Sequence, residues 1–157
     1  MDKFVVFMKV PLAKIKKLRG KTNISIIECK KALEKTNGDL NKALEILEKK
    51  GADILAKKRG RETEEGLIGV YLHPDGKVAA MVKVSCESDF VARNEEFQKF
   101  VHELSMQIAA MAPSDTKELL VQPFIKDVRK TIKDLLKEVV AKLGENVKIE
   151  DFKRFEI

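Results

Sequence analysis

The chain has 157 residues, of which 44% are hydrophobic, 36% charged and 6% aromatic, and its length suits one medium-sized domain or a domain with a small appendage. Its apolar runs are shorter than the ~18 residues that span a bilayer, and the run at residues 4–8 is too short for a signal peptide. Secretion and membrane insertion are therefore excluded as default interpretations, and we expect a cytoplasmic protein.

The net charge of +6 is unevenly distributed along the chain. Residues 1–61 contain 17 Lys and Arg against 7 Asp and Glu, whereas residues 62–157 contain 14 against 18. A basic N-terminal third is typical of a face for an acidic partner, either a protein or a nucleic acid, and equally of a solvated helical surface. Charge alone leaves both interpretations open.

The basic residues fall mostly in a segment, residues 1–51, that is predicted to form three short amphipathic helices. The first helix begins behind Pro11, a residue favoured in the first helical turn. Its apolar residues recur at helical spacing and are Leu12, Ile15 and Leu18. A bundle of this size indicates a binding module because it leaves no room for an active-site cavity.

The next two predicted helices have clear boundary signals. Ser25 and Glu28 form a capping-box pattern at the start of the second helix. Asp39 is placed to cap the third helix, which we expect to end just before Gly51. Residues 52–65 are charged with little apolar content, and they are predicted to form a connector whose first residues can be helical.

After the connector, the hydrophobic period changes from helical to alternating. Residues 67–72 and 77–87 are predicted to form a β-hairpin around a turn at residues 73–76. The alternation places one set of side chains on a buried face, and they are Val78, Ala80, Val82, Val84 and Cys86. The opposite face is predicted to carry Lys77, Lys83, Ser85 and Glu87.

Two long helices and a final strand complete the predicted core. The first helix covers about residues 94–112, and its stripe consists of Phe97, Phe100, Val101, Leu104, Ile108 and Met111. The second is predicted to follow Thr131 as its cap, with Asp134 three positions on. Residues 147–157 are predicted to form a strand with a bulge near Asp151 and Phe152.

These elements predict an α+β domain over residues 66–157, in which helices cover one face of a small antiparallel three-stranded sheet. The last strand carries Phe155 and Ile157 at its end, and such a sheet leaves an edge and a face that need cover. We therefore expect a homodimer. The alternative is that the terminus tucks under its own helices.

The sequence lacks the parts of an enzyme. Cys29 and Cys86 have no CxxC motif or Cys/His cluster around them, which argues against a zinc site or disulfide and predicts two buried thiols. His73 lies in the predicted turn and His102 lies off the apolar stripe. No phosphate-binding glycine loop, HExxH motif or nucleophile elbow occurs. We therefore expect no catalysis, no metal site and no cofactor.

The junction between the hairpin and the next helix is the most distinctive segment. A large apolar residue, Phe90, stands between Asp89 and Arg93 where the strand gives way to a helix at Asn94. In one interpretation Phe90 packs on the following helix as a hydrophobic staple, with Asp89 as the N-terminal cap. In the other, Asp89 and Phe90 form a wedge, held at a rigid corner, that enters a partner.

This junction, ESDFVARNEEF, resembles the TDFVA(K/R)N signature of bacterial elongation factor Ts. Upstream, LRGKTNISIIECKKALEKTNGDLNKALEIL resembles that family's UBA-like N-terminal domain, LRxxTGxxxxxCKKAL followed by an NGD turn. QPFIKD and AKLGENVKIEDFKRFE resemble the end of the short, single-core members. The likeness extends from about Met8 to Ile157, so residues 1–7 are expected to be an upstream extension.

The resemblance implies a guanine-nucleotide exchange factor, not an enzyme, that binds elongation factor Tu and promotes replacement of GDP by GTP. The N-terminal module would dock on the nucleotide-binding domain of elongation factor Tu, through Arg19, Thr22, Ile26, Ile27 and Lys30. The core would insert Phe90 beside the nucleotide site and displace Mg²⁺, with Ser88, Asp89, Phe90 and Val91 as the contact residues. Short members are expected to pair as homodimers and to bind no nucleic acid directly.

The chain departs from the family pattern at a few positions. Thr22-Asn23 stands where the family has Thr-Gly, Ile26 and Ile27 stand in place of methionines, and Ser88 stands in place of Thr. Two other protein classes explain part of the pattern. A basic RNA-binding protein fits the charge but lacks aromatic residues for base stacking in the basic third. A UBA-like adaptor fits the three helices but leaves the core and Phe90 unexplained.

Overall fold

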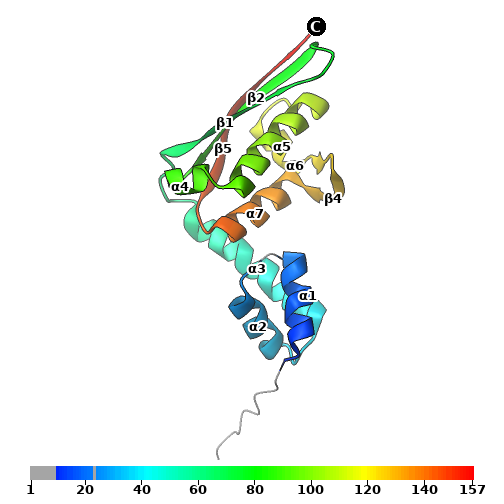
Figure 1. Cartoon of the computed structure of the whole chain (residues 1–157), viewed down its shortest axis with the longest axis vertical. Helices are drawn as coiled ribbons and strands as arrows, with labels where there is room; N and C mark the ends of the chain where they lie inside the picture. The colour runs from blue at the N-terminus through cyan, green and yellow to red at the C-terminus, as the bar shows by residue number, and fades with distance from the viewer. Residues whose placement is uncertain (1–9, 23) are drawn as a thin grey trace, which may run out of the picture. The chain divides into compact units, whose positions relative to one another are not determined.

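The computed structural model describes residues 10–22 and 24–157, apart from the side chains of residues 54 and 55. The contacts divide the chain into two compact units, Met1–Ile54 and Leu55–Ile157 (Figure 1). The proposed upstream extension and Asn23 lie outside the described residues. Within the described part of the chain, no helix is both long and apolar enough to cross a membrane.

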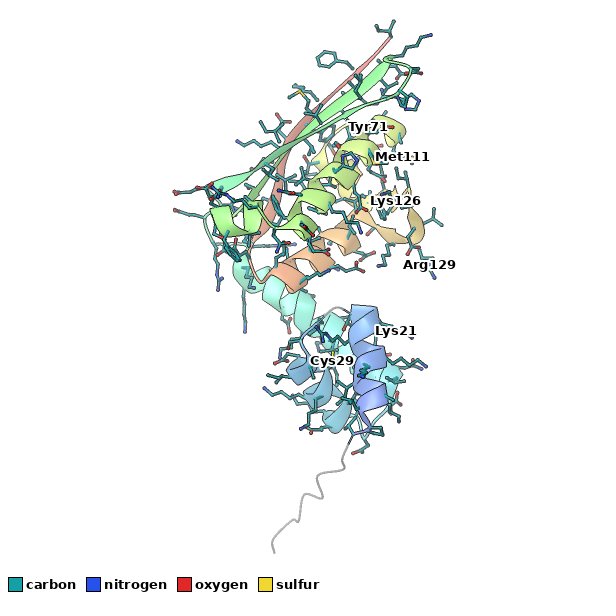
Figure 2. All side chains as sticks on the ribbon, viewed as in Figure 1. Lys21, Cys29, Tyr71, Met111, Lys126 and Arg129 are labelled. Atoms are coloured by element: carbon teal, nitrogen blue, oxygen red, sulfur yellow. The ribbon has the colours of Figure 1, made fainter. Side chains whose placement is uncertain are left out.

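The N-terminal unit is built from three helices, as predicted. They are α1 (Leu12–Thr22), α2 (Ile26–Lys35) and α3 (Leu40–Lys58). Their buried side chains form a small core of Ile15, Leu18, Cys29, Ala32, Leu33, Ala43 and Leu47, and Figure 2 shows Cys29 among these helices. Leu12 was expected on the apolar stripe but is exposed, because it is the first residue of α1 and no other helix covers it.

The predicted caps of α2 and α3 are present, with one difference. The Glu28 backbone N–H donates to Ser25 Oγ at 3.3 Å, which is half of a capping box. The Glu28 carboxylate pairs with Lys50 instead of turning back to the cap, and this lowers the pKa of Glu28. At the start of α3, Asp39 Oδ1 accepts two backbone N–H groups, at 3.0 and 3.1 Å.

The expectation that the third helix ends before Gly51 was wrong. Helix α3 continues through Gly51 to Lys58, so the first half of the charged connector, residues 52–58, is helical. A glycine ends a helix where its backbone turns into the left-handed region, and Gly51 is not among the glycines with positive φ. Within a helix, glycine costs only about 1 kcal/mol relative to alanine, so the flanking residues carry the helix past it.

The second unit contains the predicted three-stranded antiparallel sheet, in the order β1-β2-β5. The strands are β1 (Glu65–Leu72), β2 (Val78–Cys86) and β5 (Val147–Glu156). The hairpin turn is closed by hydrogen bonds from Gly76 N to His73 O and from His73 N to Val78 O, both 2.8 Å. In β5, Asp151 pairs with Lys83 and Ile149 with Val84, so the bulge is at Glu150, next to its predicted place.

The bulge explains one side chain whose burial differs from the prediction. Ser85 belongs to the predicted solvent-facing set but is buried. Its hydroxyl donates to Glu150 Oε1 at 2.6 Å and to Thr63 Oγ1 at 2.9 Å as alternative partners. Thr63, two positions before β1, and Glu150, the bulged residue of β5, together cover this end of the outer sheet face.

Helices lie on one face of the sheet (Figure 1), which confirms the predicted α+β class. They are α5 (Glu95–Met111), α6 (Thr116–Val121) and α7 (Ile132–Leu143). A single turn, α4 (Asp89–Ala92), precedes α5, and a two-stranded ribbon of β3 (Pro123–Phe124) and β4 (Asp127–Thr131) precedes α7. The sequence analysis missed α4, α6 and the ribbon because elements this short show no hydrophobic period.

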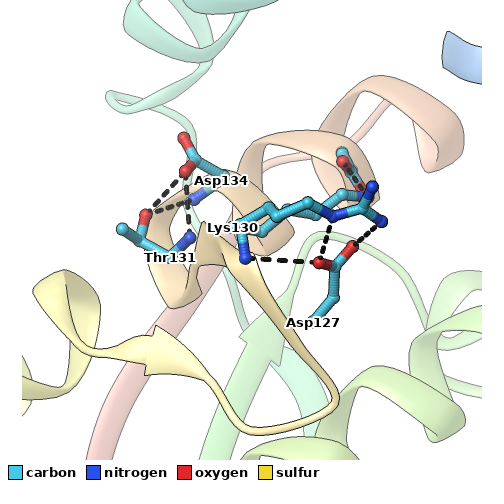
Figure 3. Close-up of polar contacts among 6 residues, drawn as sticks. Asp127, Lys130, Thr131 and Asp134 are labelled. Atoms are coloured by element: carbon cyan, nitrogen blue, oxygen red, sulfur yellow. Dashed lines mark hydrogen bonds and ion pairs between the residues drawn. The ribbon is translucent and has the colours of Figure 1, made fainter.

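The core of the second unit lies between the sheet and its helices. Its largest fully buried side chains include Phe97, Phe100, Leu104, Ile108, Leu119, Ile132, Val82 and Val84. Met111 was predicted to complete the stripe of α5 but is exposed at the helix end (Figure 2), where Ala112 turns into the left-handed region with φ of 44°. Helix α7 begins with the predicted cap: Thr131 and Asp134 form a complete capping box (Figure 3).

Candidate functional site

The corner between β2 and α5 is the first candidate site, and we define it as residues 86–94. Ser88 caps α4 by accepting the Val91 backbone N–H at 3.3 Å. Val91 and Ala92 are buried in the core beneath, with 5% and 3% exposure. Phe90, on the same single turn, is 84% exposed. The turn is therefore anchored on one side while it presents a large apolar side chain to solvent on the other.

The staple interpretation of Phe90 was wrong. A staple would bury the ring against α5, whereas the ring is largely exposed. Asp89 is not a cap either, because Ser88 caps α4 and Asn94 caps α5 by accepting the Glu96 N–H at 2.8 Å. Asp89 instead pairs with Arg93 at 2.8 Å on the surface. An exposed aromatic flanked by charges adds little to folding and is typical of a surface that contacts a partner.

A carboxylate far away in the sequence holds the corner. Glu145 Oε1 accepts the backbone N–H groups of Glu87 at 3.1 Å and Ser88 at 3.0 Å. Glu145 Oε2 accepts the Ser88 hydroxyl at 2.6 Å. The sequence analysis missed Glu145, because a single acidic residue in a predicted turn before the last strand gives no signal of what it contacts.

A second carboxylate, that of Glu87, links the corner to the turn between α7 and β5 from the other side. Glu87 Oε1 accepts the Asn146 backbone N–H at 2.6 Å and lies 3.6 Å from Arg61 Nη1. The Asn146 side chain in turn donates to the Arg61 carbonyl at 2.9 Å. The carboxylate of Glu145 thus accepts backbone N–H groups of the corner, and the carboxylate of Glu87 accepts a backbone N–H of the turn between α7 and β5. We call this reciprocal arrangement the Glu87–Glu145 clasp.

Cys86 is unsuited to nucleophilic chemistry. Burial, followed by the nearby charge of Glu145, raises the pKa of its thiol to about 11. The thiol donates to the Ser88 carbonyl at 3.3 Å, so it serves the local structure of the corner. No group of His, Cys, Asp and Glu among the described residues has a geometry that could hold a metal ion.

The histidines form no catalytic arrangement with the corner. His73 lies in the hairpin turn, where its Nδ1 is 3.3 Å from the Tyr71 hydroxyl and its Nε2 is 3.9 Å from Asp75. His102 is exposed on α5, as predicted, and its ring lies edge-on to that of Tyr71. Tyr71, His73 and Asp75 line a pocket of about 370 Å³, to which His102 does not contribute.

The residues predicted to dock from the N-terminal module lie in the other unit, on α1 and α2. Four of them are exposed, and they are Arg19, Ile26, Ile27 and Lys30. Thr22 differs, because its hydroxyl donates to the Leu18 carbonyl at 2.9 Å and accepts the Ile24 N–H at 3.3 Å. Its hydroxyl is therefore used within the module, where it shapes the connection between α1 and α2.

All of the corner except Cys86 lies inside a stretch that matches a known protein family. The family model for elongation factor TS matches residues 87–157. Elongation factor Ts of Nitratidesulfovibrio vulgaris is 40% identical over 195 residues, which cover 96% of this chain and 98% of that protein. Elongation factor Ts of Coprothermobacter proteolyticus is 37% identical over 193 residues, which cover 94% of this chain and 98% of that protein. The chain belongs to the elongation factor Ts family.

Membership of the elongation factor Ts family confirms the resemblance and makes the protein a translation elongation factor, with a role in protein biosynthesis. Elongation factor Ts of Thermotoga maritima is also similar, at 37% identity over 193 residues. These aligned stretches are longer than the 157 residues of this chain, so the relatives carry residues that have no counterpart here.

The outer face of the sheet is the second candidate site of this member of the elongation factor Ts family. It carries exposed apolar side chains from all three strands or their ends, and they are Ile68, Val70, Leu72, Met81, Phe155 and Ile157. Val70 pairs with Met81, and Leu72 and Phe155 both pair with Ala79, so these residues form one continuous surface. Ile157 is fully exposed, which contradicts the alternative that the terminus tucks under the helices.

Proposed function

We propose that the protein is a guanine-nucleotide exchange factor that binds elongation factor Tu in its GDP-bound form and promotes replacement of GDP by GTP. The observation that carries this proposal is the exposure of Phe90 on a turn whose neighbouring residues are buried. Family membership supports the choice of partner. An RNA-binding protein or a UBA-like adaptor would leave the exposed Phe90 without a role.

In the proposed mechanism, Phe90 inserts between helices of elongation factor Tu beside the nucleotide site. Ser88 fixes the turn, Val91 anchors it, and Asp89 offers a carboxylate next to the inserted ring. Insertion displaces groups that position the Mg²⁺ ion. Because Mg²⁺ bridges and neutralises phosphate oxygens, the loss of its ligands weakens the binding of GDP.

The exchange follows from thermodynamic coupling. If the factor lowers the affinity of elongation factor Tu for GDP, then GDP lowers the affinity for the factor by the same ratio. The same coupling applies to GTP, so incoming GTP lowers the affinity of elongation factor Tu for the factor and releases it to act again. The factor forms and breaks no covalent bond, so it is not an enzyme in this proposal, and it needs no cofactor of its own.

The N-terminal unit is proposed to provide docking. Exposed Ile26 and Ile27 offer apolar contact area at the start of α2, and Arg19 and Lys30 offer positive charge beside it. Thr22 contributes through the shape of the connection between α1 and α2. We place the protein in the cytoplasm, where elongation takes place.

The outer sheet face is proposed to bind a second copy of the chain. An apolar surface drawn from three strands and open to water favours burial against a partner, and a two-fold arrangement of the same face satisfies both copies. This proposal concerns assembly and is independent of the exchange mechanism.

The proposal is tested by following fluorescent GDP as it leaves elongation factor Tu in excess unlabelled nucleotide. The protein is expected to accelerate the release, and Phe90→Ala is expected to remove most of the acceleration. Release at the unassisted rate in the presence of the folded protein would refute the exchange function.

A further inference from the structure

We propose that Glu145 is a positioning residue for the exchange wedge, which it controls through the Glu87 and Ser88 backbone and the Ser88 hydroxyl. The inference rests on the proposed function, because it assigns a role within the same site. Of the four residues predicted to contact the partner at this corner, Glu145 forms its hydrogen bonds with Ser88 alone. It therefore affects nucleotide exchange indirectly, by fixing the backbone of α4 that carries Phe90.

The first argument is the set of hydrogen bonds. Beyond the end of β2 the backbone N–H groups of Glu87 and Ser88 have left the sheet, and both donate to the single carboxylate of Glu145, at 3.1 and 3.0 Å. Hydrogen bonds to an ionised acceptor are stronger than neutral ones. Buried or half-buried N–H groups without an acceptor are costly, so the corner depends on this carboxylate to keep its backbone path.

The second argument is the direction of the Ser88 hydroxyl. The hydroxyl donates to Glu145 Oε2 at 2.6 Å, which leaves its lone pairs free to accept the Val91 N–H at 3.3 Å. A hydroxyl has only one proton to donate, so an acceptor that takes this proton also orients the cap. Glu145 thus stabilises the first turn of α4, where Phe90 is the second residue.

The third argument is reciprocity within the clasp. Glu87 accepts the Asn146 N–H at 2.6 Å, so each of the two segments supplies a carboxylate and a backbone N–H to the other. Arg61 Nη1 lies 3.6 Å from Glu87 Oε1 and adds a positive charge beside that carboxylate. Movement of α4 away from the turn before β5 therefore breaks several bonds together.

The consequence for Phe90 follows from its exposure. With 84% of the residue exposed, the ring is held by few contacts of its own, and its direction depends on the backbone of α4. A side chain that is already held in its binding direction loses less conformational freedom on insertion. Glu145 therefore raises the rate of nucleotide release by holding Phe90 in its binding direction before the ring inserts.

The test measures fluorescent GDP release from elongation factor Tu at increasing concentrations of the factor. Glu145→Ala is expected to lower the maximal release rate on the order of tenfold, by analogy with misplaced catalytic groups, with a smaller change in the half-saturating concentration. The matched control is Glu138→Ala. It removes an equal charge from α7, where Glu138 pairs with Lys130 at 2.7 Å, and it is expected to leave the release rate unchanged.

A double variant separates positioning from general structure. If Glu145 acts through Phe90, then elongation factor Tu releases GDP at the same rate with the double variant Phe90→Ala/Glu145→Ala as with Phe90→Ala alone. Glu145→Gln is expected to restore part of the rate, because its amide oxygen accepts backbone N–H groups and its amide N–H can donate to Ser88 Oγ. If Glu145→Ala lowered the assisted rate of GDP release by the same factor in the wild type and in the Phe90→Ala background, the inference would be overturned. Such a result would show that Glu145 acts independently of Phe90.

Amide hydrogen exchange followed by NMR provides a readout that needs no partner. The Glu87 and Ser88 amides are expected to exchange faster in Glu145→Ala than in the wild type, while the amides of α5 keep their protection. Unchanged exchange at both positions would overturn the inference. If the wild type fails to accelerate GDP release, the proposed function is refuted, and this measurement still decides whether Glu145 holds the corner.

Discussion

Phe90 and Val91 are adjacent on one helical turn, yet Phe90 is 84% exposed and Val91 is 5% exposed. The burial of Val91 and Ala92 fixes the turn to the core, so the neighbouring ring projects into solvent from a rigid base. A loop that carried the same aromatic residue would lose more conformational entropy on binding.

The first prediction separates function from folding at this turn. Because Phe90 makes few contacts within the chain, Phe90→Ala is expected to change the free energy of unfolding by no more than about 0.5 kcal/mol. The assisted rate of GDP release is expected to fall by about tenfold or more. Urea unfolding and stopped-flow fluorescence measure the two effects.

The matched control for this variant is Val121→Ala, which removes an exposed apolar side chain from α6 in the same unit. It is expected to change neither the stability nor the release rate. If Phe90→Ala loses stability as a buried aromatic does, about 3–5 kcal/mol, the ring is packed in solution and the wedge account fails.

The second prediction concerns self-association through the outer sheet face. The protein is expected to have twice its chain mass of 17.8 kDa in solution. Val70→Lys, which places a charge in the middle of the exposed apolar surface, is expected to yield the single-chain mass by light scattering.

Lys117→Glu changes a charge on the exposed surface of α6, on the helical side of the sheet, and serves as a control that keeps the dimer. A wild-type protein with the mass of one chain at micromolar concentration would contradict the proposed dimer. That result would leave the exchange mechanism untouched, because the outer face and the corner are separate surfaces of the domain.

The third prediction uses the capping box of α7 (Figure 3). The Thr131 N–H and hydroxyl both donate to Asp134 and lower the pKa of its carboxyl below the usual 3.8. A depressed pKa in the folded state stabilises the protein above the usual pKa, and this contribution disappears as the pH falls through the folded value. Thermal unfolding should therefore show Asp134→Asn less stable than the wild type at neutral pH, with the difference shrinking below pH 3.8.

Glu138→Gln, an exposed carboxylate on the same helix, is the control and is expected to differ little from the wild type at either pH. A destabilisation by Asp134→Asn that stays constant down to strongly acidic pH would show that the charge of Asp134 is not what stabilises the cap.

The fourth prediction concerns the two thiols. Both cysteines are buried, and burial with the nearby charge of Glu145 raises the pKa of Cys86 to about 11. Since the thiolate is the reactive form, a thiol reagent at neutral pH is expected to label neither cysteine in the folded protein and both after denaturation. Rapid labelling of Cys86 in a Cys29→Ala variant would show that the corner opens readily.

The sequence predicted the parts of this fold that have a strong hydrophobic period. Alternation over residues 77–87 and the 3.6-residue stripes of α5 and α7 indicated the sheet and the helices that cover it. The end of α3 was misplaced at Gly51, because glycine ends a helix only when the backbone beyond it turns away. The ribbon of β3 and β4 was missed because it is too short to show a period.

At the candidate site, the sequence indicated Phe90 but not the side chains that hold its turn. Glu145 is separated from Ser88 by four helices, α4 to α7, and the two-stranded ribbon, and one carboxylate among many acidic residues carries no sign of its partners. Thr22 shows the opposite case, because its hydroxyl is used inside the module where a contact with a partner was expected. Contacts between distant segments require the folded backbone to be seen.

The central claim is that this corner promotes nucleotide release, and its most direct test is the rate at which fluorescent GDP leaves elongation factor Tu. The account predicts a large acceleration by the wild-type protein and its collapse in the Asp89→Ala/Phe90→Ala variant, which remains folded. An unassisted release rate with the folded wild type and elongation factor Tu from the same source would contradict the account, as would full acceleration by the double variant.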